Sequence, residues 1–144
     1  MKALDGVELL PLVCRRRTAV LDGATAHATL PAVDMARAAQ FYTEKVGAVA
    51  RESSKGGAFF SVGDSMFSIY QTPNTTRGGH TQMGLRVPDV RAAVAELRSR
   101  GVVFEEYDFP GLKTVDGIAD VGDGSAAWFK DTEDNTIGLL QLNP

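Results

Sequence analysis

The most constraining feature of this sequence is a segment that occurs twice. Residues 26–47 and 81–101 each read as a β-strand that runs directly into an amphipathic helix. A shift of 55 residues superposes Asp34 on Asp89 and carries four apolar helix positions of the first copy onto apolar positions of the second. Because these positions are spaced i, i+3, i+4 and i+7, both helices are predicted to bury the same stripe. The sequence therefore predicts a tandem duplication.

Both predicted helices are bounded by residues of the same kind. Asp34 and Asp89 each precede the first apolar position, where a carboxylate can accept from the free N–H groups of the first turn. Gly47 and Gly101 follow the last turn, where glycine commonly ends a helix. A cation in the last turn, such as Lys45, complements the carbonyl end of the helix dipole. Each helix is therefore expected to begin after its aspartate and to end at its glycine.

Short β-type runs follow each helix. They cover residues 48–52, 58–62 and 65–71 in the first repeat, and residues 102–107, 125–130 and 136–142 in the second, which also has a long loop at 109–124 with room for a short strand. Each repeat is therefore predicted to be a βαβββ module, with module one at residues 25–71 and module two at residues 80–142. The predicted fold class is α+β, in one domain over residues 25–144. Residues 1–24 have no counterpart in the second half and are predicted to be an N-terminal extension.

The composition limits the kinds of molecule that the protein is expected to bind. A net charge of -3 over 144 residues argues against a nucleic-acid-binding protein, which normally carries a basic face. The single cysteine, Cys14, excludes an internal disulfide and fits a reducing compartment. The apolar stretch at residues 7–14 is too short to span a bilayer and is interrupted by Glu8 and Pro11. We therefore expect a cytoplasmic protein that has neither a nucleic-acid nor a membrane partner.

Three motifs carry a resemblance to a known superfamily. They are H-x-T-L-P-x-x-D from His27 to Asp34, F-Y-x-x-x-x-G from Phe41 to Gly47, and W-F-x-D-x-x-x-N-x-I from Trp128 to Ile137. Together with the duplicated module, these motifs resemble the vicinal oxygen chelate superfamily, which includes glyoxalase I, bleomycin-resistance proteins and extradiol dioxygenases. The resemblance covers residues 25–142. It implies a curled mixed sheet that forms a cup with the helices on its outer face, and it implies a homodimer.

The resemblance also implies where a metal would bind in metal-dependent members. Their ligands come from the first and last strands of each module, and these positions fall here on His27, Ser68, Gln82 and Gly138. The last-strand positions usually carry glutamates, which neutralise a divalent ion and in glyoxalase-like reactions also act as the base. Serine is a weak neutral ligand and glycine offers no side chain. We therefore expect no metal and no other cofactor, and the sequence leaves open whether the protein is an enzyme.

Six side chains are the candidate ligand-binding residues: His27, Ser68, Tyr70, Gln82, Arg86 and Trp128. His27 and Gln82 are either hydrogen-bonding groups of a pocket or metal ligands. Arg86 either anchors an anionic ligand or pairs with an acidic neighbour at the rim. Tyr70 and Trp128 either stack on a planar ligand or fill the core.

Three functional hypotheses follow from these residues. The first is a metal-free protein that binds an apolar or aromatic small molecule, in the sequestering manner that a likeness to bleomycin-resistance proteins implies. The second is a metal-dependent lyase, isomerase or dioxygenase in which Asp120 or Asp123 from the long loop completes a non-standard ligand set. The third is a metal-free enzyme that uses His27 as its general base. In each case the partner is a small molecule.

Overall fold

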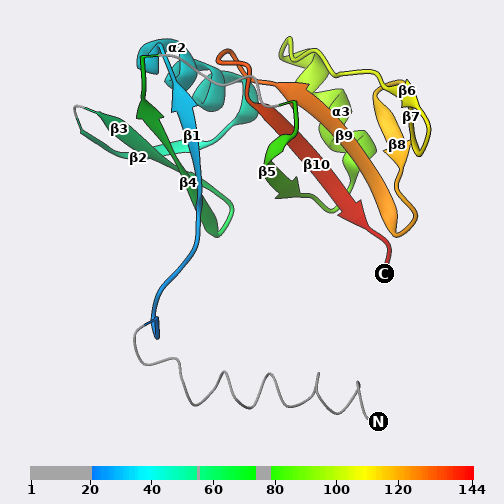
Figure 1. The fold of residues 1–144 in the computed structure, drawn as a ribbon, viewed down its shortest axis with the longest axis horizontal. Coiled ribbons are helices and arrows are strands. Elements are labelled where there is room, and N and C mark those ends of the chain that lie inside the picture. Colours follow the sequence, from blue (N-terminus) through cyan, green and yellow to red (C-terminus); the bar gives the residue numbers. More distant parts are fainter. Residues whose placement is uncertain (1–20, 55, 74–78) are drawn as a thin grey trace.

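The structure is a computed structural model that describes residues 21–54, 56–73 and 79–144 (Figure 1). Most of the extension predicted at residues 1–24 lies outside the described residues. The chain folds as two α+β modules in succession, which confirms the predicted fold class and the duplication. No helix in the described ranges is long and apolar enough to cross a membrane.

The first module has one helical segment and four strands. In chain order its elements are β1 (Ala28–Ala32), α2 (Met35–Gln40), a π-helical continuation η1 (Phe41–Val46), β2 (Val49–Ser54), β3 (Gly57–Val62) and β4 (Ser65–Gln71). The strands form a sheet in the order β1-β4-β3-β2, with β1 parallel to β4 and the other pairs antiparallel. The predicted order of strand, helix and three strands is therefore confirmed.

The second module repeats this plan with six strands in place of four. Its elements are β5 (Thr81–Arg86), α3 (Val90–Ser99), β6 (Asp108–Phe109), β7 (Leu112–Val115), β8 (Ile118–Asp120), β9 (Gly124–Lys130) and β10 (Thr136–Leu142). They form a sheet in the order β5-β10-β9-β8-β7-β6, in which β5 and β10 are parallel. Neither sheet closes on itself, because each has two different strands at its edges.

The N-terminal caps of both helices are as the sequence predicts. The Asp34 side chain accepts from Arg37 N at 3.0 Å, and the Asp89 side chain accepts from Ala92 N at 3.1 Å. Gly47, which follows η1, has a φ of 84°, a left-handed conformation that glycine adopts without steric cost. Both helices therefore begin after the expected aspartate. The first helical segment ends at Gly47, and α3 ends at Ser99 with Arg100 as its C-cap, two residues before Gly101.

One hydrophobic core joins the modules on the helix side of both sheets. Tyr42, from η1, is fully buried and lies 5.0 Å, ring to ring, from Phe67 on β4. Phe41 reaches across to Phe129 on β9, with the ring centroids 6.2 Å apart. In Figure 1, α2 lies behind β1, and α3 lies behind β9 and β10. Among the residues that the structure describes, no helix covers the opposite side of either sheet.

The strand predicted at residues 102–107 is wrong. This segment makes a single bridge, between Phe104 and Phe129, and Glu105 N donates to Trp128 O at 2.8 Å. The next part of the same β9 edge is occupied by β8, which pairs with Ser125–Ala127. The segment therefore has no free strand edge along which to extend. The strands β6, β7 and β8 all lie within or at the start of the loop predicted at 109–124.

Candidate functional site

Each sheet has one face on the core and one face without a covering helix, and we call the latter the open faces. Along each strand, successive side chains point alternately to the core face and to the open face. Leu30 and Ile69 are both 1% exposed and pack under the helix, whereas the intervening Thr29 and Ser68 belong to the open face of module one. In Figure 1 both open faces lie on the near side of the molecule. Four of the six candidate ligand-binding residues lie on these surfaces.

The open face of module one combines aromatic rings with hydroxyl groups. Thr29, Ser68 and Phe59 are aligned across β1, β4 and β3, and Ser68 Oγ donates to Thr29 Oγ1 at 3.1 Å. The His27 ring lies edge-on to Phe59, with 5.4 Å between their centroids. A hollow of about 370 Å³ is bounded by residues that include Phe59, Ser68 and Tyr70, and Tyr70 is 45% exposed. Three of the six candidate residues therefore lie together here.

The open face of module two is built around a tryptophan that lies over a glycine. Trp128 and Gly138 are register partners on β9 and β10. A β-carbon on Gly138 would lie 3.2 Å from Trp128 Nε1 and 3.2 Å from Thr81 Cγ2. The indole Nε1 donates to Thr81 Oγ1 at 3.0 Å, which holds the ring in this position. The indole therefore covers the last-strand position at which metal-dependent relatives are expected to carry a carboxylate.

Two further aromatic residues extend this surface. Tyr107 lies edge-on to Trp128 at 5.6 Å and to Phe109 at 5.9 Å, measured between ring centroids. Together with Leu112 they bound a hollow of about 250 Å³. Burial, helped by the Glu105 carboxylate, raises the pKa of the Tyr107 hydroxyl, so this ring stays a neutral phenol at physiological pH. The surface offers flat, uncharged faces to a ligand.

Gln82 lies elsewhere, in a polar network between the modules. Its Nε2 donates to Asn135 Oδ1 at 2.9 Å, and its Oε1 accepts from Thr136 N at 3.1 Å. Both polar ends of this amide are thus engaged by the chain segment that leads from β9 to β10. Of the four superfamily metal positions, this is the one whose side chain is most fully committed to protein contacts.

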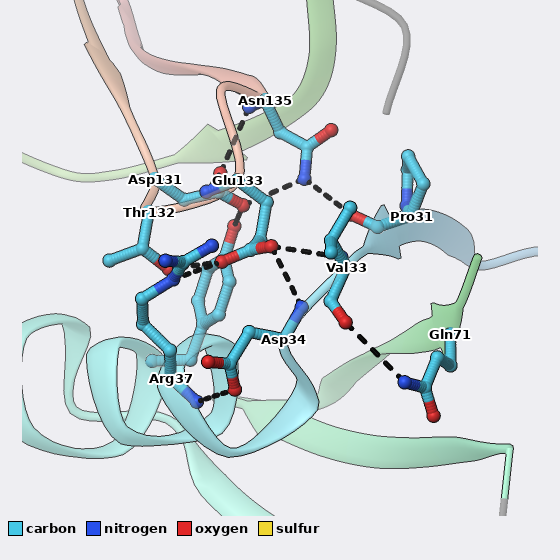
Figure 2. Close-up of polar contacts among 10 residues, drawn as sticks. Pro31, Val33, Asp34, Arg37, Gln71, Asp131, Thr132, Glu133 and Asn135 are labelled. Atoms are coloured by element: carbon cyan, nitrogen blue, oxygen red, sulfur yellow. Dashed lines mark hydrogen bonds and ion pairs between the residues drawn. The ribbon is translucent and has the colours of Figure 1, made fainter. Parts of the chain in front are cut away.

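The network is centred on the turn between β9 and β10, Asp131–Asn135, which we call the DTEDN turn (Figure 2). Asp131 Oδ1 accepts from the backbone N–H groups of Glu133 and Asn135 at 2.8 and 2.9 Å. Its Oδ2 accepts from Tyr42 OH at 2.6 Å and from Asn135 Nδ2 at 2.8 Å. Burial and the Asp131 carboxylate raise the pKa of Tyr42, which keeps the hydroxyl a donor. The turn of module two is thereby bonded to the helix of module one.

Glu133 makes the second connection of this turn to module one. Its Oε1 accepts from Val33 N and Asp34 N at 2.9 and 3.1 Å, and its Oε2 accepts from Arg37 Nε at 2.8 Å. Burial alone would raise the pKa of this carboxyl, but these bonds and one from Thr132 Oγ1 lower it from 4.5 to about 2. Figure 2 shows the carboxylate enclosed by these donors. Glu133 is therefore ionised at all physiological pH values.

Arg86 lies apart from the other candidates, at a crevice between the modules. The crevice has a volume of about 660 Å³ and is bounded by the β3–β4 turn, by the end of β5 and by one side of α3. We call it the inter-module crevice. Of the six predicted residues, His27, Ser68 and Tyr70 thus lie on one open face and Trp128 on the other, Gln82 lies in the DTEDN network, and Arg86 lines the crevice.

The side chains at the superfamily metal positions do not fit a divalent ion. Gly138 has no side chain and is covered by Trp128, and the Ser68 hydroxyl is directed to Thr29. The amide of Gln82 is used within the protein. Within residues 21–54, 56–73 and 79–144, no group of three or more His, Cys, Asp or Glu side chains could hold a metal ion. No step that depends on a metal can be built on these groups.

Two tandem βαβββ modules with open sheet faces are the architecture of the vicinal oxygen chelate proteins. The sequence agrees with this class. The chain belongs to the Glyoxalase/Bleomycin resistance protein/Dioxygenase superfamily, whose sequence profile matches residues 24–139. No protein with a curated description matches the chain significantly.

Solved structures share the fold over nearly their whole length. TnmS3, an antibiotic binding protein from Streptomyces sp. CB03234, is 26% identical with a TM-score of 0.59, and the match covers 83% of this chain and 98% of that one. A bleomycin-binding protein from Streptomyces verticillus, solved with copper(II)-bleomycin, is 20% identical with a TM-score of 0.63, covering 82% and 95%. The fosfomycin resistance protein FosX from Listeria monocytogenes, solved with Mn(II) and sulfate, is 16% identical with a TM-score of 0.61, covering 83% and 90%.

Sequence reasoning missed three aromatic residues of the open faces. Phe59 precedes the fully buried Phe60, so strict alternation along β3 would have placed it opposite the core. Tyr107 and Phe109 lie in a stretch that was predicted as strand and loop, and no periodic pattern pointed to Trp128 as their neighbour. Alternation along the strand could therefore have identified Phe59, whereas no sequence pattern indicated Tyr107 or Phe109.

Proposed function

We propose that this protein binds an apolar or aromatic small molecule on its open sheet faces, without a metal ion, and sequesters it. The observation that carries the proposal is the placement of Trp128 over Gly138. In metal-dependent members of the superfamily, this position is expected to carry a carboxylate that binds the metal and moves a proton. In this protein a flat aromatic ring covers it. A site of this composition favours stacking and apolar contact over acid–base chemistry.

The distribution of exposed apolar side chains supports the same function. On the two open faces, Tyr70 is 45% exposed, Met66 43% and Phe109 53%. The hydroxyl groups of Thr29 and Thr81 accept hydrogen bonds from Ser68 and Trp128 on these faces and add a few polar groups. An apolar surface with few polar groups is the usual composition of a site for drug-sized ligands.

The comparisons support binding of a natural product in particular. TnmS3, at 26% identity, is an antibiotic binding protein, and the Streptomyces verticillus protein binds bleomycin. We therefore place an antibiotic or a related polycyclic aromatic compound first among the ligands to test. A homodimer in the cytoplasm belongs to the same proposal, and analytical ultracentrifugation of the purified chain tests the dimer.

Metal titration separates this proposal from an enzyme of the same superfamily. Protein purified without chelator is expected to contain less than a tenth of an equivalent of metal by elemental analysis, and titration with nickel, zinc, manganese or iron(II) is expected to give no binding at micromolar concentrations, because carboxylate ligands are missing. Tight binding of one equivalent that is lost in His27→Ala would contradict the proposal. It would instead favour a metal-dependent lyase, isomerase or dioxygenase.

Ligand binding can be followed through a single fluorophore. Trp128 is the only tryptophan of the chain, so quenching of intrinsic tryptophan emission reports on the open face of module two. Bleomycin and a panel of planar polycyclic compounds are expected to include at least one that quenches this emission and raises the melting temperature. Tyr70→Ala is expected to weaken that ligand roughly three- to tenfold, as the loss of one aromatic contact of about 1 kcal/mol requires.

A matched control is available for the Tyr70 variant. Val103 is 79% exposed and lines neither of the two open-face hollows, so Val103→Ala is expected to leave the affinity unchanged. If Tyr70→Ala and Val103→Ala bind the ligand equally well, the open face of module one takes no part. If no compound quenches the emission or stabilises the protein, the sequestering function is wrong.

A further inference from the structure

The inter-module crevice is a hollow that the open-face site does not use. Its volume of about 660 Å³ falls within the range of roughly 300 to 1,000 Å³ that is usual for small-molecule sites. One wall comes from module one, through Val46 and the β3–β4 turn, and the other from β5 and α3 of module two. The crevice therefore exists only because the two modules lie side by side.

The interior of the crevice is apolar. Leu97 on α3 and Leu139 on β10 are 8% and 2% exposed, and they form its deepest part. Leu85, Val46 and Val62 are half-buried and line the sides. A ligand with an apolar body would remove these side chains from water, and each square ångström of apolar surface so buried contributes about 25 cal/mol.

The charged groups at the rim differ in whether they are already paired. Arg100 forms an ion pair with Glu96 and donates from Nη1 to Lys45 O at 3.1 Å. Among the residues that the structure describes, the exposed Arg86 side chain makes neither a hydrogen bond nor an ion pair. Asp64 adds one negative charge on the opposite wall. The rim thus presents one cation whose charge no described group neutralises.

The backbone beside Arg86 adds hydrogen-bond donors. Val87 N donates to Leu140 O of β10 at 2.9 Å. Successive residues of a parallel strand direct their N–H groups alternately to the two sides, so those of Gly84 and Arg86, two residues that line the crevice, point away from β10. In the described part of the chain, β5 is the last strand of its sheet, and no strand pairs with this edge. The donors are available to a ligand.

We propose that the inter-module crevice is a second binding site, specific for an amphipathic monocarboxylate. The apolar body of the ligand lies against Leu85, Leu97 and Leu139, and its carboxylate accepts from the Arg86 guanidinium and from the free N–H groups of the β5 edge. Asp64 disfavours a second negative charge on the ligand. This proposal is independent of the open-face function, because none of the open-face aromatic residues lines the crevice.

Calorimetric titration with a matched pair of probes tests the site. We expect 2-naphthoate to bind at least tenfold more tightly than the neutral 2-naphthamide of the same shape, since a hydrogen bond to a charged group contributes about 1.5 to 3 kcal/mol. Arg86→Gln is expected to abolish this preference by weakening only the naphthoate. Arg91→Gln, an exposed arginine of α3 that does not line the crevice, is expected to change neither affinity.

A second variant tests the apolar interior. Ala93 is half-buried on the crevice side of α3, and Ala93→Phe is expected to fill the cavity and to weaken both probes at least tenfold. Its melting temperature and circular dichroism verify that the protein is folded. Equal affinities for the two probes, no binding of either, or naphthoate binding that survives Arg86→Gln unchanged would each overturn the proposal. Binding that survives Ala93→Phe would place the probe on another surface and would also overturn it.

Discussion

Glu133→Gln is expected to lower the free energy of unfolding at pH 7 by about 3 kcal/mol, because the carboxylate would no longer be present to accept its charge-assisted hydrogen bonds. Folding lowers the pKa of this group from 4.5 to about 2. At about 1.4 kcal/mol per pKa unit, that difference gives the stated loss. The donors left without a carboxylate are Val33 N, Asp34 N and the Arg37 guanidinium. Urea unfolding followed by circular dichroism measures the effect.

The same variant has a defined dependence on pH. A carboxyl group with a lowered folded-state pKa stabilises the fold fully above its unfolded value and loses this contribution as the pH falls through its folded value. The difference in unfolding free energy between the two proteins is therefore expected to be constant from pH 7 to about 5. It should then shrink as the pH falls from about 4.5 toward 2.

Glu44→Gln is the matched control for this experiment. Glu44 is an exposed glutamate on η1 whose carboxylate accepts, among the described residues, only from Gln40 Nε2, at 3.3 Å, so the change is expected to stay within about 0.5 kcal/mol. Equal unfolding midpoints for Glu133→Gln and Glu44→Gln would mean that the bonds of the DTEDN turn to module one contribute nothing. A difference that persists at pH 2 would contradict the assignment of the effect to ionisation.

The second large effect is expected at Gly138, where the chain itself supplies a comparison. Gly138 and Gly84 are register partners on β10 and β5. A β-carbon on Gly84 meets nothing within 4 Å, whereas one on Gly138 comes within 3.2 Å of the Trp128 indole. Gly138→Ala is therefore expected to lower the free energy of unfolding by about 1 to 3 kcal/mol and to shift the tryptophan emission. Gly84→Ala should be neutral or slightly stabilising.

Placing a carboxylate at position 138, as in metal-dependent members of the superfamily, is expected to lower the free energy of unfolding further than Gly138→Ala does. Gly138→Glu would displace the indole and bring a negative charge to a buried position, so a loss of more than about 3 kcal/mol is expected. Metal titration of any folded variant should still give no binding. Micromolar metal affinity in Gly138→Glu would mean that the other ligand positions are more competent than their contacts indicate.

The local features of the fold were readable from the sequence, because they depend on neighbouring residues. The caps at Asp34 and Asp89 and the strand at residues 65–71 follow from short-range patterns, and the structure has them as predicted. The segment at 102–107 also alternates, and by itself it reads as a strand. Whether it extends depends on β9, whose edge is already taken by β8. That competition is a property of the tertiary structure.

The positions of the candidate site residues could likewise be predicted only where they depend on local patterns. Alternation along β4 placed Ser68 and Tyr70 on one surface, where they bound the same hollow. Gln82 and Arg86, four residues apart on β5, also share one face of their strand by alternation. Their surroundings nevertheless differ. Asn135 and Thr136 hydrogen-bond to the Gln82 side chain, whereas Arg86 lines the inter-module crevice. These contacts come from residues about 50 positions away, and no local pattern specifies them.

The two modules differ in whether the start of the helix is bonded by the other module. Gln71 and Gln141 occupy matching places on β4 and β10, and each bonds to the start of its own helix: Gln71 Nε2 donates to Val33 O at 3.4 Å, and Gln141 Oε1 accepts from Val90 N at 2.9 Å. Among the described residues, a carboxylate from the other half reaches only the start of the module-one helix, and Glu133 follows Val33 by 100 residues. During synthesis, these contacts of Glu133 can form only after most of module two has been made, whereas the bond between Val90 and Gln141 lies within one half of the chain.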